Sequence, residues 1–465
     1  MADIHFATLE ILERTGLRLY DEEAVTLLKK AGAHVSEGNL VRIPARLVEW
    51  AIQIAPKRIP LYDRNGRQVM ALQGNNCYFG TGSDCPHILD HRTGARREAT
   101  LADVVDGMRV CDYLPNIDFV MSMFIPSDVP VPISDRYQME AMLLNTTKPI
   151  VYVTHDLDGC RDAVEMAEVV AGGPDALRAN PTACCYINIT APLRHNGEAI
   201  QKLMFLAKKG LPSIYVGSNT TRGVITPVTA AAAVALGNAG ALAGLVLAQL
   251  VREGAPVVVM RTGGGGLDMS TMVSSYASPE TQGYRGDVCH YYGLPIFGMA
   301  GCSDSKLPDE QALAEASLTL LVDSLMGANL IHDVGYIEYG LTNSLEMLTM
   351  CDDVIGWIRR FMEPQPVNRE TLALDLIHEA GPDGEYLDKD HTYRHFREEW
   401  YPRLMNRDNR SNWEMAGGKS YREVAREKVE QVLETHRAPE LDVDVQRGIR
   451  AVLERAANSA GVRLS

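Results

Sequence analysis

The chain has 465 residues, of which 46% are hydrophobic and 23% are charged, and its formal net charge is −15 at pH 7. These proportions argue against wholesale disorder and against a membrane protein, and the acidic charge argues against a nucleic-acid partner, because nucleic-acid binding rests on clustered Lys and Arg. The nine cysteines are an odd, scattered set that predicts no disulfide framework, and the sequence has no CxxC or HExxH motif for a self-contained metal site.

The first 70 residues are predicted to form an N-terminal helical segment. Apolar residues recur at helical spacing in FATLEILERTGLRL, DEEAVTLLKKAGA and PARLVEWAIQIA. The start, MADIHFATLEILERTG, is acidic and amphipathic and lacks the basic region and continuous apolar core of a signal peptide. We therefore expect a cytoplasmic protein.

From residue 71 to residue 363, short β-branched or aromatic runs alternate with amphipathic helical segments. A proline stands near the start of several runs, as in KPIV, LPSI, APVV and LPIF, where it stops the preceding helix. Eight such units in a row predict a closed (β/α)8 TIM barrel, whereas a doubly wound open sheet, the alternative fold, would usually stop nearer six strands. The predicted strands are residues 76–82, 116–124, 148–155, 182–190, 211–218, 255–264, 294–301 and 328–336.

Two segments outside this pattern need their own interpretation. The Ala/Gly-rich stretch 229–250 is long enough to cross a membrane, but Asn238, Gln249 and its glycines favour a tightly packed buried helix. Residues 364–465 lose the strand pattern and predict a C-terminal helical extension, polar on one face. This extension would pack on the barrel or on a second subunit, so a homo-oligomer is compatible with the sequence.

In a (β/α)8 barrel, the residues at the carboxyl ends of the strands form the active site. For Tyr78 and Phe79 either residue can instead face the helices, since alternate residues of a strand point to opposite sides. The glycines at 263–266 could form an anion nest, but the following LDMST is no phosphate-loop sequence, which favours a plain turn. The residues predicted to bind substrate are Tyr78, Phe79, Asn188, His332, Tyr336 and Tyr339, with Asp84, His155, Gly264 and Asp304 in supporting positions.

The exit of the last predicted strand concentrates polar and aromatic residues. Neighbours in a strand face opposite ways, so His332 and Asp333 are not expected to pair, and His332 is interpreted as a donor to a substrate oxygen or as a structural histidine. Tyr336 and Tyr339 can curl over the active site, and several aromatic rings around a small volume are typical of quaternary ammonium binding. A metal held by His155, Cys185 and His332 is a less favoured alternative.

The chain resembles the trimethylamine methyltransferase superfamily over essentially its whole length. The resemblance is carried by residues 5–35, 298–361 and 395–429, and Gly335, Tyr336, Gly340 and Leu341 match the family pattern at the strand-eight block. It implies a (β/α)8 barrel that transfers a methyl group from an amine to the Co(I) of a corrinoid protein. The founding members carry pyrrolysine, whereas this sequence shows only standard residues and resembles the non-pyrrolysine branch, of which glycine betaine:corrinoid methyltransferases are the familiar type.

This resemblance agrees with elementary chemistry. A quaternary amine leaves as a neutral tertiary amine, so no general acid is needed, and the enzyme would act by binding and alignment, without a catalytic residue of its own. The expected reaction moves a methyl group from a quaternary amine, with glycine betaine as the best guess, and releases a tertiary amine such as dimethylglycine. The corrinoid would come from a partner protein or free cobalamin, because the Asp-x-His-x-x-Gly motif of corrinoid domains is not matched by DIHFAT at residues 3–8.

Several alternatives stay open from the sequence. The substrate could be proline betaine, a carnitine relative or choline. A non-enzymatic betaine-binding protein and a metal-dependent TIM-barrel enzyme are the other classes, and one zinc per chain would distinguish the latter.

Overall fold

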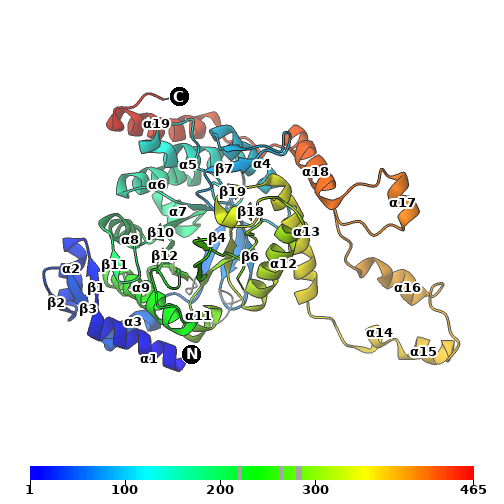
Figure 1. Ribbon diagram of the computed structural model, residues 1–465, viewed down its shortest axis with the longest axis horizontal. Coiled ribbons are helices and arrows are strands. Elements are labelled where there is room, and N and C mark those ends of the chain that lie inside the picture. Colours follow the sequence, from blue (N-terminus) through cyan, green and yellow to red (C-terminus); the bar gives the residue numbers. More distant parts are fainter. Residues whose placement is uncertain (218–220, 261–264, 279–284, 465) are drawn as a thin grey trace.

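The computed structural model of the protein describes residues 1–217, 221–260, 265–278 and 285–464 (Figure 1). Its centre is a parallel sheet of seven strands in the order β6-β17-β16-β13-β12-β10-β9. Each strand lies within one of the predicted strand ranges, so the alternating strand and helix pattern is confirmed there. The strands are β6 (Tyr78–Phe79), β9 (Ile150–Tyr152), β10 (Ala183–Asn188), β12 (Ser213–Val216), β13 (Val257–Met260), β16 (Ile296–Met299) and β17 (Leu330–His332).

The predicted strand at 116–124 is the exception, because it forms only isolated bridges. Phe119 bridges in parallel to Gly80, beside the edge strand β6, and Val120 bridges in parallel to Ile150 in the other edge strand, β9. The two edges of the sheet therefore meet the same short segment.

Side chains replace part of the backbone ladder in this segment. The Asp118 carboxylate accepts the N–H of Phe79 at 2.7 Å, and the Thr81 hydroxyl accepts the N–H of Met121 at 2.9 Å. A donor satisfied by a side chain no longer pairs with a neighbouring strand. The range 116–124 is therefore mostly buried without becoming a regular strand, and Met123 within it has a left-handed backbone with φ of 64°.

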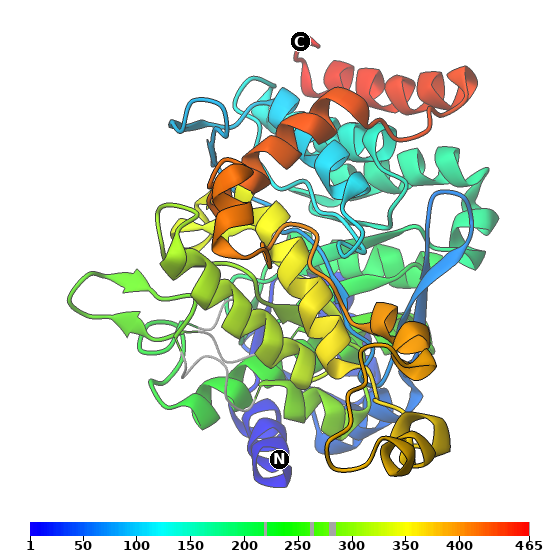
Figure 2. The ribbon, with the colours of Figure 1, turned by 90° about the vertical axis from the view of Figure 1, so that its right-hand side faces the viewer.

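Helices follow the strands and cover the outer face of the sheet (Figures 1 and 2). They occupy the stretches between the strands, and several begin at a side-chain cap, as where Asp156 accepts the N–H of Gly159. The covering helices are α4 (Leu101–Tyr113), α5 (Ser134–Asn145), α6 (Leu157–Ala171), α7 (Pro174–Ala179), α8 (Gly197–Lys209), α9 (Ala230–Val251), α11 (Arg285–Tyr292), α12 (Glu310–Leu325) and α13 (Leu345–Met362).

A hairpin of β4 (Ile59–Tyr62) and β5 (Gln68–Leu72) fills the end of the sheet at which the strands begin. Its inward side chains pack with the core inside the sheet, where Phe297 and Leu330 are fully buried. The backbone N–H of Tyr62 donates to the carbonyl of Pro181, shortly before β10. This hairpin does not fill the opposite end of the sheet, where the strands finish, so that end can hold a functional site.

The N-terminal segment contains the expected helices α1 (Ala2–Glu10), α2 (Glu22–Lys30) and α3 (Ala45–Ile54), but it is not purely helical. Besides the β4–β5 hairpin it has three short strands, which form a four-stranded sheet with a strand from the middle of the chain, in the order β11-β1-β3-β2. Three-residue strands are too short to show an alternating pattern, which is why the sequence did not reveal them. The three N-terminal strands are β1 (Leu17–Leu19), β2 (His34–Ser36) and β3 (Leu40–Arg42), and the strand from the middle of the chain is β11 (Arg194–His195).

The Ala/Gly-rich stretch forms α9, which among the described residues is the helix long and apolar enough to cross a membrane. Within its most apolar window, 78% of the residues are buried inside the protein. The buried Asn238 amide donates to Thr8 of α1 and to the Tyr292 hydroxyl of α11, at 3.1 and 2.9 Å. The helix is packed from several sides, as its small residues predict.

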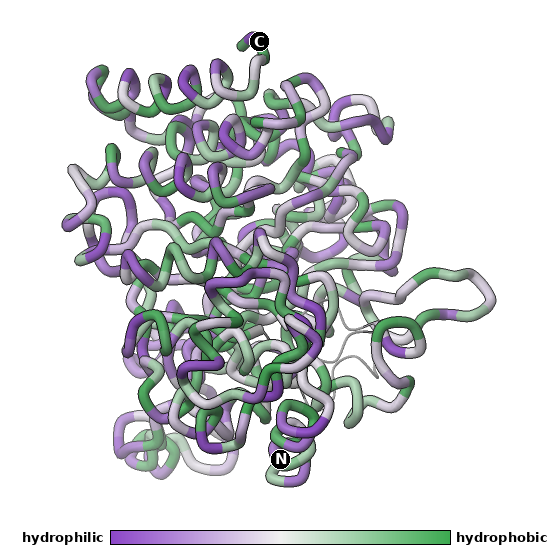
Figure 3. Tube along the Cα trace, turned by 90° about the vertical axis from the view of Figure 1, so that its left-hand side faces the viewer, coloured by the Kyte–Doolittle hydropathy of each residue, from purple (hydrophilic) through white to green (hydrophobic). Residues whose placement is uncertain are grey.

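The C-terminal extension has two parts that behave differently. The helices α18 (Tyr421–Thr435) and α19 (Val443–Ala460) pack on helices that cover the sheet, and hydrophilic and hydrophobic residues alternate along α19 (Figure 3). The short helices α14 (Arg369–Leu372), α15 (Leu374–Ala380), α16 (Asp390–His395) and α17 (Arg410–Met415) project away from the body (Figure 1).

Glu346 anchors α18 to α13, and its loss is expected to destabilise the fold. Its fully buried carboxylate accepts hydrogen bonds from Arg422 at 3.1 Å and from Arg426 at 2.8 Å. We expect Glu346→Ala to lower the free energy of unfolding by about 2–3 kcal/mol, because two guanidinium groups lose a charged acceptor. Thermal and denaturant unfolding measure the change, and Glu430→Ala, an exposed position on α18, is the control; equal stability of both variants would refute the anchor.

Candidate functional site

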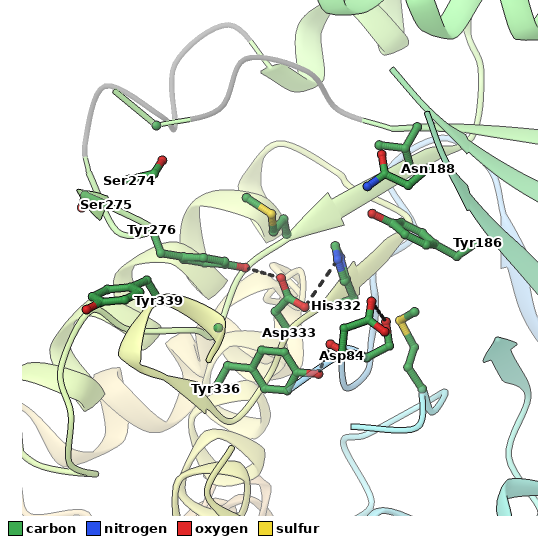
Figure 4. Close-up of a pocket in the computed structure, with 16 residues that line it drawn as sticks. Asp84, Tyr186, Asn188, Ser274, Ser275, Tyr276, His332, Asp333, Tyr336 and Tyr339 are labelled. Atoms are coloured by element: carbon green, nitrogen blue, oxygen red, sulfur yellow. Dashed lines mark hydrogen bonds and ion pairs between the residues drawn. The ribbon is translucent and has the colours of Figure 1, made fainter. Parts of the chain in front are cut away.

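A cavity of about 280 Å³ opens where the strands of the sheet end (Figure 4). Tyr186 and Asn188 of β10, Val216 of β12, Met299 of β16 and His332 of β17 line its wall. Its other described lining residues come from segments outside the seven strands of the sheet: Ser83, Asp84, Met121, Gly265, Ser274, Ser275, Tyr276, Asp333, Tyr336, Tyr339 and Gly340.

His332 is held by two fixed contacts on the cavity wall. Its Nδ1 donates to the carbonyl of Gly298 at 2.5 Å, and its ring stacks on Phe297 with 4.1 Å between centroids. Because Nδ1 carries the proton, Nε2 is bare in the neutral ring and donates only when the imidazole is protonated. Its Nε2 lies 3.4 Å from Asp333 Oδ1.

This contact corrects the expectation that His332 and Asp333 face opposite ways. The strand has ended at His332, and Asp333 has a left-handed backbone with φ of 78°, which turns its carboxylate back toward the imidazole. On its other side, Asp333 Oδ2 accepts the hydroxyl of Tyr276 at 3.0 Å. Tyr276, Asp333 and His332 thus form a connected row along the cavity (Figure 4).

Gly82 makes this arrangement sterically permissible. A Cβ atom at this position would lie 2.1 Å from Asp333 Oδ1 and 2.8 Å from the ring of Tyr336. Neither distance is compatible with a side chain, so the glycine brings the carboxylate and the phenol ring together.

Tyr336 contributes its ring to the cavity and its hydroxyl to the fold. The hydroxyl donates to the carbonyl of Ser83 at 2.8 Å and lies 3.1 Å from that of Met123. Burial raises the pKa of this phenol well above its ordinary value, and the nearby Asp333 carboxylate acts in the same direction. The ring is therefore a fixed, neutral wall.

Tyr339 has a different environment at the rim. It adopts a left-handed backbone with φ of 48°, and the Lys306 ammonium lies 5.1 Å from the centre of its ring. Lys306 also donates to the carbonyl of Asp304 at 2.8 Å. The Tyr339 ring thus already has a cation near it.

Asp84 lies at the cavity with a left-handed backbone, φ 74°, and accepts the hydroxyl of Ser83 at 2.8 Å. Its side chain is exposed and reaches solvent through the cavity. Desolvation by the protein around the cavity still raises the pKa of this carboxyl above its ordinary 3.8; the hydrogen bond from Ser83 opposes the increase, and the Asp333 charge adds to it.

This shift predicts a pH dependence of cation binding. As the pH rises through the raised pKa of Asp84, the carboxyl ionises and attracts a cation, so the KM for a permanently cationic substrate is expected to fall. A quaternary ammonium does not titrate, which assigns the change to the protein. We expect Asp84→Asn to flatten the KM profile in the acidic range, and an unchanged profile in this variant would contradict the assignment.

The remaining predicted residues lie away from the cavity. Tyr78 points toward the β4–β5 hairpin, where its hydroxyl accepts the N–H of Ala71 at 3.0 Å. Phe79 faces the helices, with Arg359 5.4 Å from its ring centre. The two neighbours do point to opposite sides, but Tyr78 belongs to the start of its strand and not to the end that forms the cavity.

His155 and Asp304 act outside the cavity as well. His155 Nε2 lies 3.1 Å from the hydroxyl of Ser134, and its ring does not line the cavity. Asp304 accepts the backbone N–H of Tyr276 at 2.8 Å and the hydroxyl of Ser275, and so places Tyr276 at the cavity. The predicted residue Gly264 lies outside the described residues.

Sequence reasoning did not name two rings of the site, Tyr186 and Tyr276. Strand periodicity could have identified Tyr186, because it stands two residues before Asn188 and therefore faces the same side of the strand. No sequence pattern could have identified Tyr276, because it lies in a loop whose position depends on a hydrogen bond to the Asp304 carboxylate.

The less favoured metal site at His155, Cys185 and His332 is not assembled. Cys185 packs in the core between the sheet and the helices, and only His332 of the three lines the cavity. Among the described residues, the group spaced like metal ligands is Glu370, His391 and His395, in the C-terminal extension.

The chemistry of the cavity suits a cation. Its described lining has four phenol rings and two carboxylates, and no Lys or Arg. Ring faces attract a positive charge that cannot itself be hydrogen-bonded, and nearby carboxylates add Coulomb attraction. The tyrosines are Tyr186, Tyr276, Tyr336 and Tyr339, and the carboxylates are Asp84 and Asp333.

Comparison with known proteins agrees with the sequence resemblance. The model of the trimethylamine methyltransferase (MTTB) family matches residues 1–461. The chain is 32% identical to a trimethylamine methyltransferase of Desulfitobacterium hafniense (strain DSM 10664 / DCB-2), over 99% of this chain and 94% of that protein. It is 31% identical to the trimethylamine methyltransferase of Methanosarcina barkeri, over 97% and 93%, and 27% identical to a glycine betaine methyltransferase of D. hafniense (strain Y51), over 98% and 96%. The chain therefore belongs to the trimethylamine methyltransferase family and is a methyltransferase.

Proposed function

We propose that this enzyme transfers a methyl group from a quaternary amine to the Co(I) of a corrinoid. The Co(I) electron pair attacks the methyl carbon, the C–N bond breaks, and its electron pair stays on nitrogen, so that a neutral tertiary amine leaves and methyl-Co(III) forms. The observation that carries the proposal is the cavity in which four tyrosines and two carboxylates gather at the strand ends.

The residues of the cavity would work by holding the cation in one place. Tyr336 is fixed by its hydroxyl bonds and Tyr276 by the Asp304 contact, so both rings are in position before the substrate arrives. Alignment of two reactants can contribute on the order of 7–11 kcal/mol. A neutral leaving group needs no proton, so none of these residues has to act as an acid.

The methyl acceptor is proposed to come from outside the chain. A cavity of about 280 Å³ is at the lower end of the range for small-molecule sites, and a corrin ring needs far more space. The corrinoid, carried by a partner protein or free in solution, would therefore approach the cavity from its open side. A cytoplasmic location fits the reduced state that Co(I) requires.

Glycine betaine is the best guess for the substrate, with proline betaine, a carnitine relative or choline as alternatives. His332 is no longer the expected hydrogen-bond donor to the carboxylate of the substrate. Its Nδ1 already donates to the carbonyl of Gly298, and its Nε2 faces Asp333. We propose the Asn188 amide and the Ser274 hydroxyl for this role, since both line the cavity. The negative charges of the Asp84 and Asp333 carboxylates would then attract the ammonium group of the substrate.

We also propose that the sheet is a closed (β/α)8 barrel, with an N-terminal segment at 1–70, the barrel at 71–363 and an extension at 364–465. The support for closure is the segment at Phe119 and Val120, which bridges to both edges of the seven-stranded sheet.

The test is methyl transfer to reduced cob(I)alamin from a panel of amines, followed by the absorbance of methylcobalamin. The panel contains glycine betaine, proline betaine, carnitine and choline, with trimethylamine as the tertiary amine. We expect transfer from at least one quaternary amine and none from trimethylamine. No transfer from any quaternary amine, even with a cognate corrinoid protein, would refute the proposal.

A further inference from the structure

A long segment of the C-terminal extension has no buried residue. This segment, residues 364–399, is called the arm here, and it runs from the end of α13 to Trp400. It contains α14, α15 and α16, and projects from the body of the protein (Figure 1). Every residue in the arm is exposed or only partly covered.

The arm nevertheless carries many large apolar side chains. Val367 is 80% exposed, Leu387 89% and Tyr393 75%. Helices of four to seven residues are not stable in water without packing. The ion pairs of Glu370 with Arg394 and His395 lie on the surface, where such pairs stabilise little. The arm therefore needs another surface to cover it.

An apolar groove lies close to the point where the arm begins. It has a volume of about 530 Å³ and lies between α12 and α13, which run side by side in Figure 2. Trp357 and Phe361 of α13 are 56% and 66% exposed at this groove. Its other apolar lining residues are Leu313, Leu321, Val354, Ile358, Met405 and Tyr421.

The arm is attached to α13 at both ends and does not occupy this groove. It starts directly after α13, and it ends at Trp400, whose ring stacks on Trp357 with 6.3 Å between centroids. Beyond it, the Asp353 carboxylate accepts the backbone N–H groups of Arg403 and Met405 at 2.8 and 3.0 Å. Between these attachments the arm leaves the body.

We infer that the arm of each chain packs in the groove of a second copy of the same chain. One chain offers both an uncovered apolar arm and an uncovered apolar groove, and a twofold axis pairs both sets at once. Large exposed apolar surfaces mark interaction sites in soluble proteins. A second copy of the chain is present wherever the arm is present, so it is always available to cover the arm. The inference does not depend on the reaction that the enzyme catalyses.

The first test is the mass of the full-length protein by light scattering at several concentrations. We expect two copies of the 51.1 kDa chain, or an even multiple of two. Leu387→Glu in the arm and Phe361→Glu in the groove are each expected to weaken dimerisation at least tenfold. Val131→Glu, also at an exposed apolar residue but away from arm and groove, is the matched control and should stay dimeric. A monomeric wild type, or dimerisation that neither variant weakens, would overturn the inference.

The second test separates arm exchange from any other pairing of the same faces. A mixture of Leu387→Glu and Phe361→Glu chains contains one intact arm and one intact groove, on different chains. Reciprocal exchange therefore predicts that the mixture forms heterodimers at protein concentrations at which each variant alone is monomeric. Circular dichroism checks that both variants are folded. Two folded monomeric variants that do not associate when mixed would show that the arm does not bind this groove.

Discussion

Gly82→Ala is expected to lower kcat/KM by at least about 100-fold, which corresponds to about 2.7 kcal/mol of transition-state stabilisation. The added Cβ would stand 2.1 Å from Asp333 Oδ1 and 2.8 Å from the Tyr336 ring, so both would have to move. Steady-state kinetics with the preferred amine and cob(I)alamin measure the loss.

A matched glycine separates this effect from a general cost of substitution. At Gly266, near the same cavity, the nearest atom to an added Cβ is the Arg222 guanidinium nitrogen at 3.8 Å, an ordinary contact. Gly266→Ala should therefore leave kcat/KM within about a factor of three, by the small cost of unstrained surface changes. If Gly82→Ala is as active as Gly266→Ala, the packing of Asp333 and Tyr336 around Gly82 has no part in the reaction.

Asp333→Asn is expected to raise the KM for a quaternary amine by about 10- to 100-fold. A unit charge about 4 Å from a cation is worth about 4 kcal/mol at an effective dielectric constant of 20, and solvent in the open cavity reduces this value. Asparagine keeps the shape of the side chain and can still accept the hydroxyl of Tyr276, so the variant removes mainly the charge.

The neutral carbon analogue of the substrate provides the control, because a tert-butyl group has the shape of trimethylammonium without its charge. Its inhibition constant should be similar in the wild type and in Asp333→Asn. A parallel loss for the analogue and the amine would assign the effect of Asp333 to shape and not to charge.

Most strands of the fold could be predicted from the sequence because two independent patterns indicate each of them. A proline ends the preceding helix, and a short β-branched run follows, as at Pro295 before β16. The segment at Phe119 could not be assigned correctly in this way, because Asp118 and Thr81 take backbone donors that a regular strand would use. Side-chain hydrogen bonds of this kind depend on the tertiary fold.

The site was readable only where side-chain direction follows from strand periodicity. Asn188 and His332 end their strands, and both line the cavity. Asp333 was misjudged, because its positive φ reverses the alternation that the strand would impose. The place of Tyr276 depends on Asp304, which is distant in the sequence, and no local pattern encodes such a contact.

The hairpin of β4 and β5 has a kinetic consequence. Since its apolar side chains fill one end of the sheet, the amine, its demethylated product and the methyl acceptor all have to use the opening at the other end. With the proposed reaction, the amine would have to enter before the acceptor docks, and its product could leave only after the acceptor departs. The expected kinetic mechanism is therefore ordered, with the methylated acceptor as the first product released and the amine product as the last.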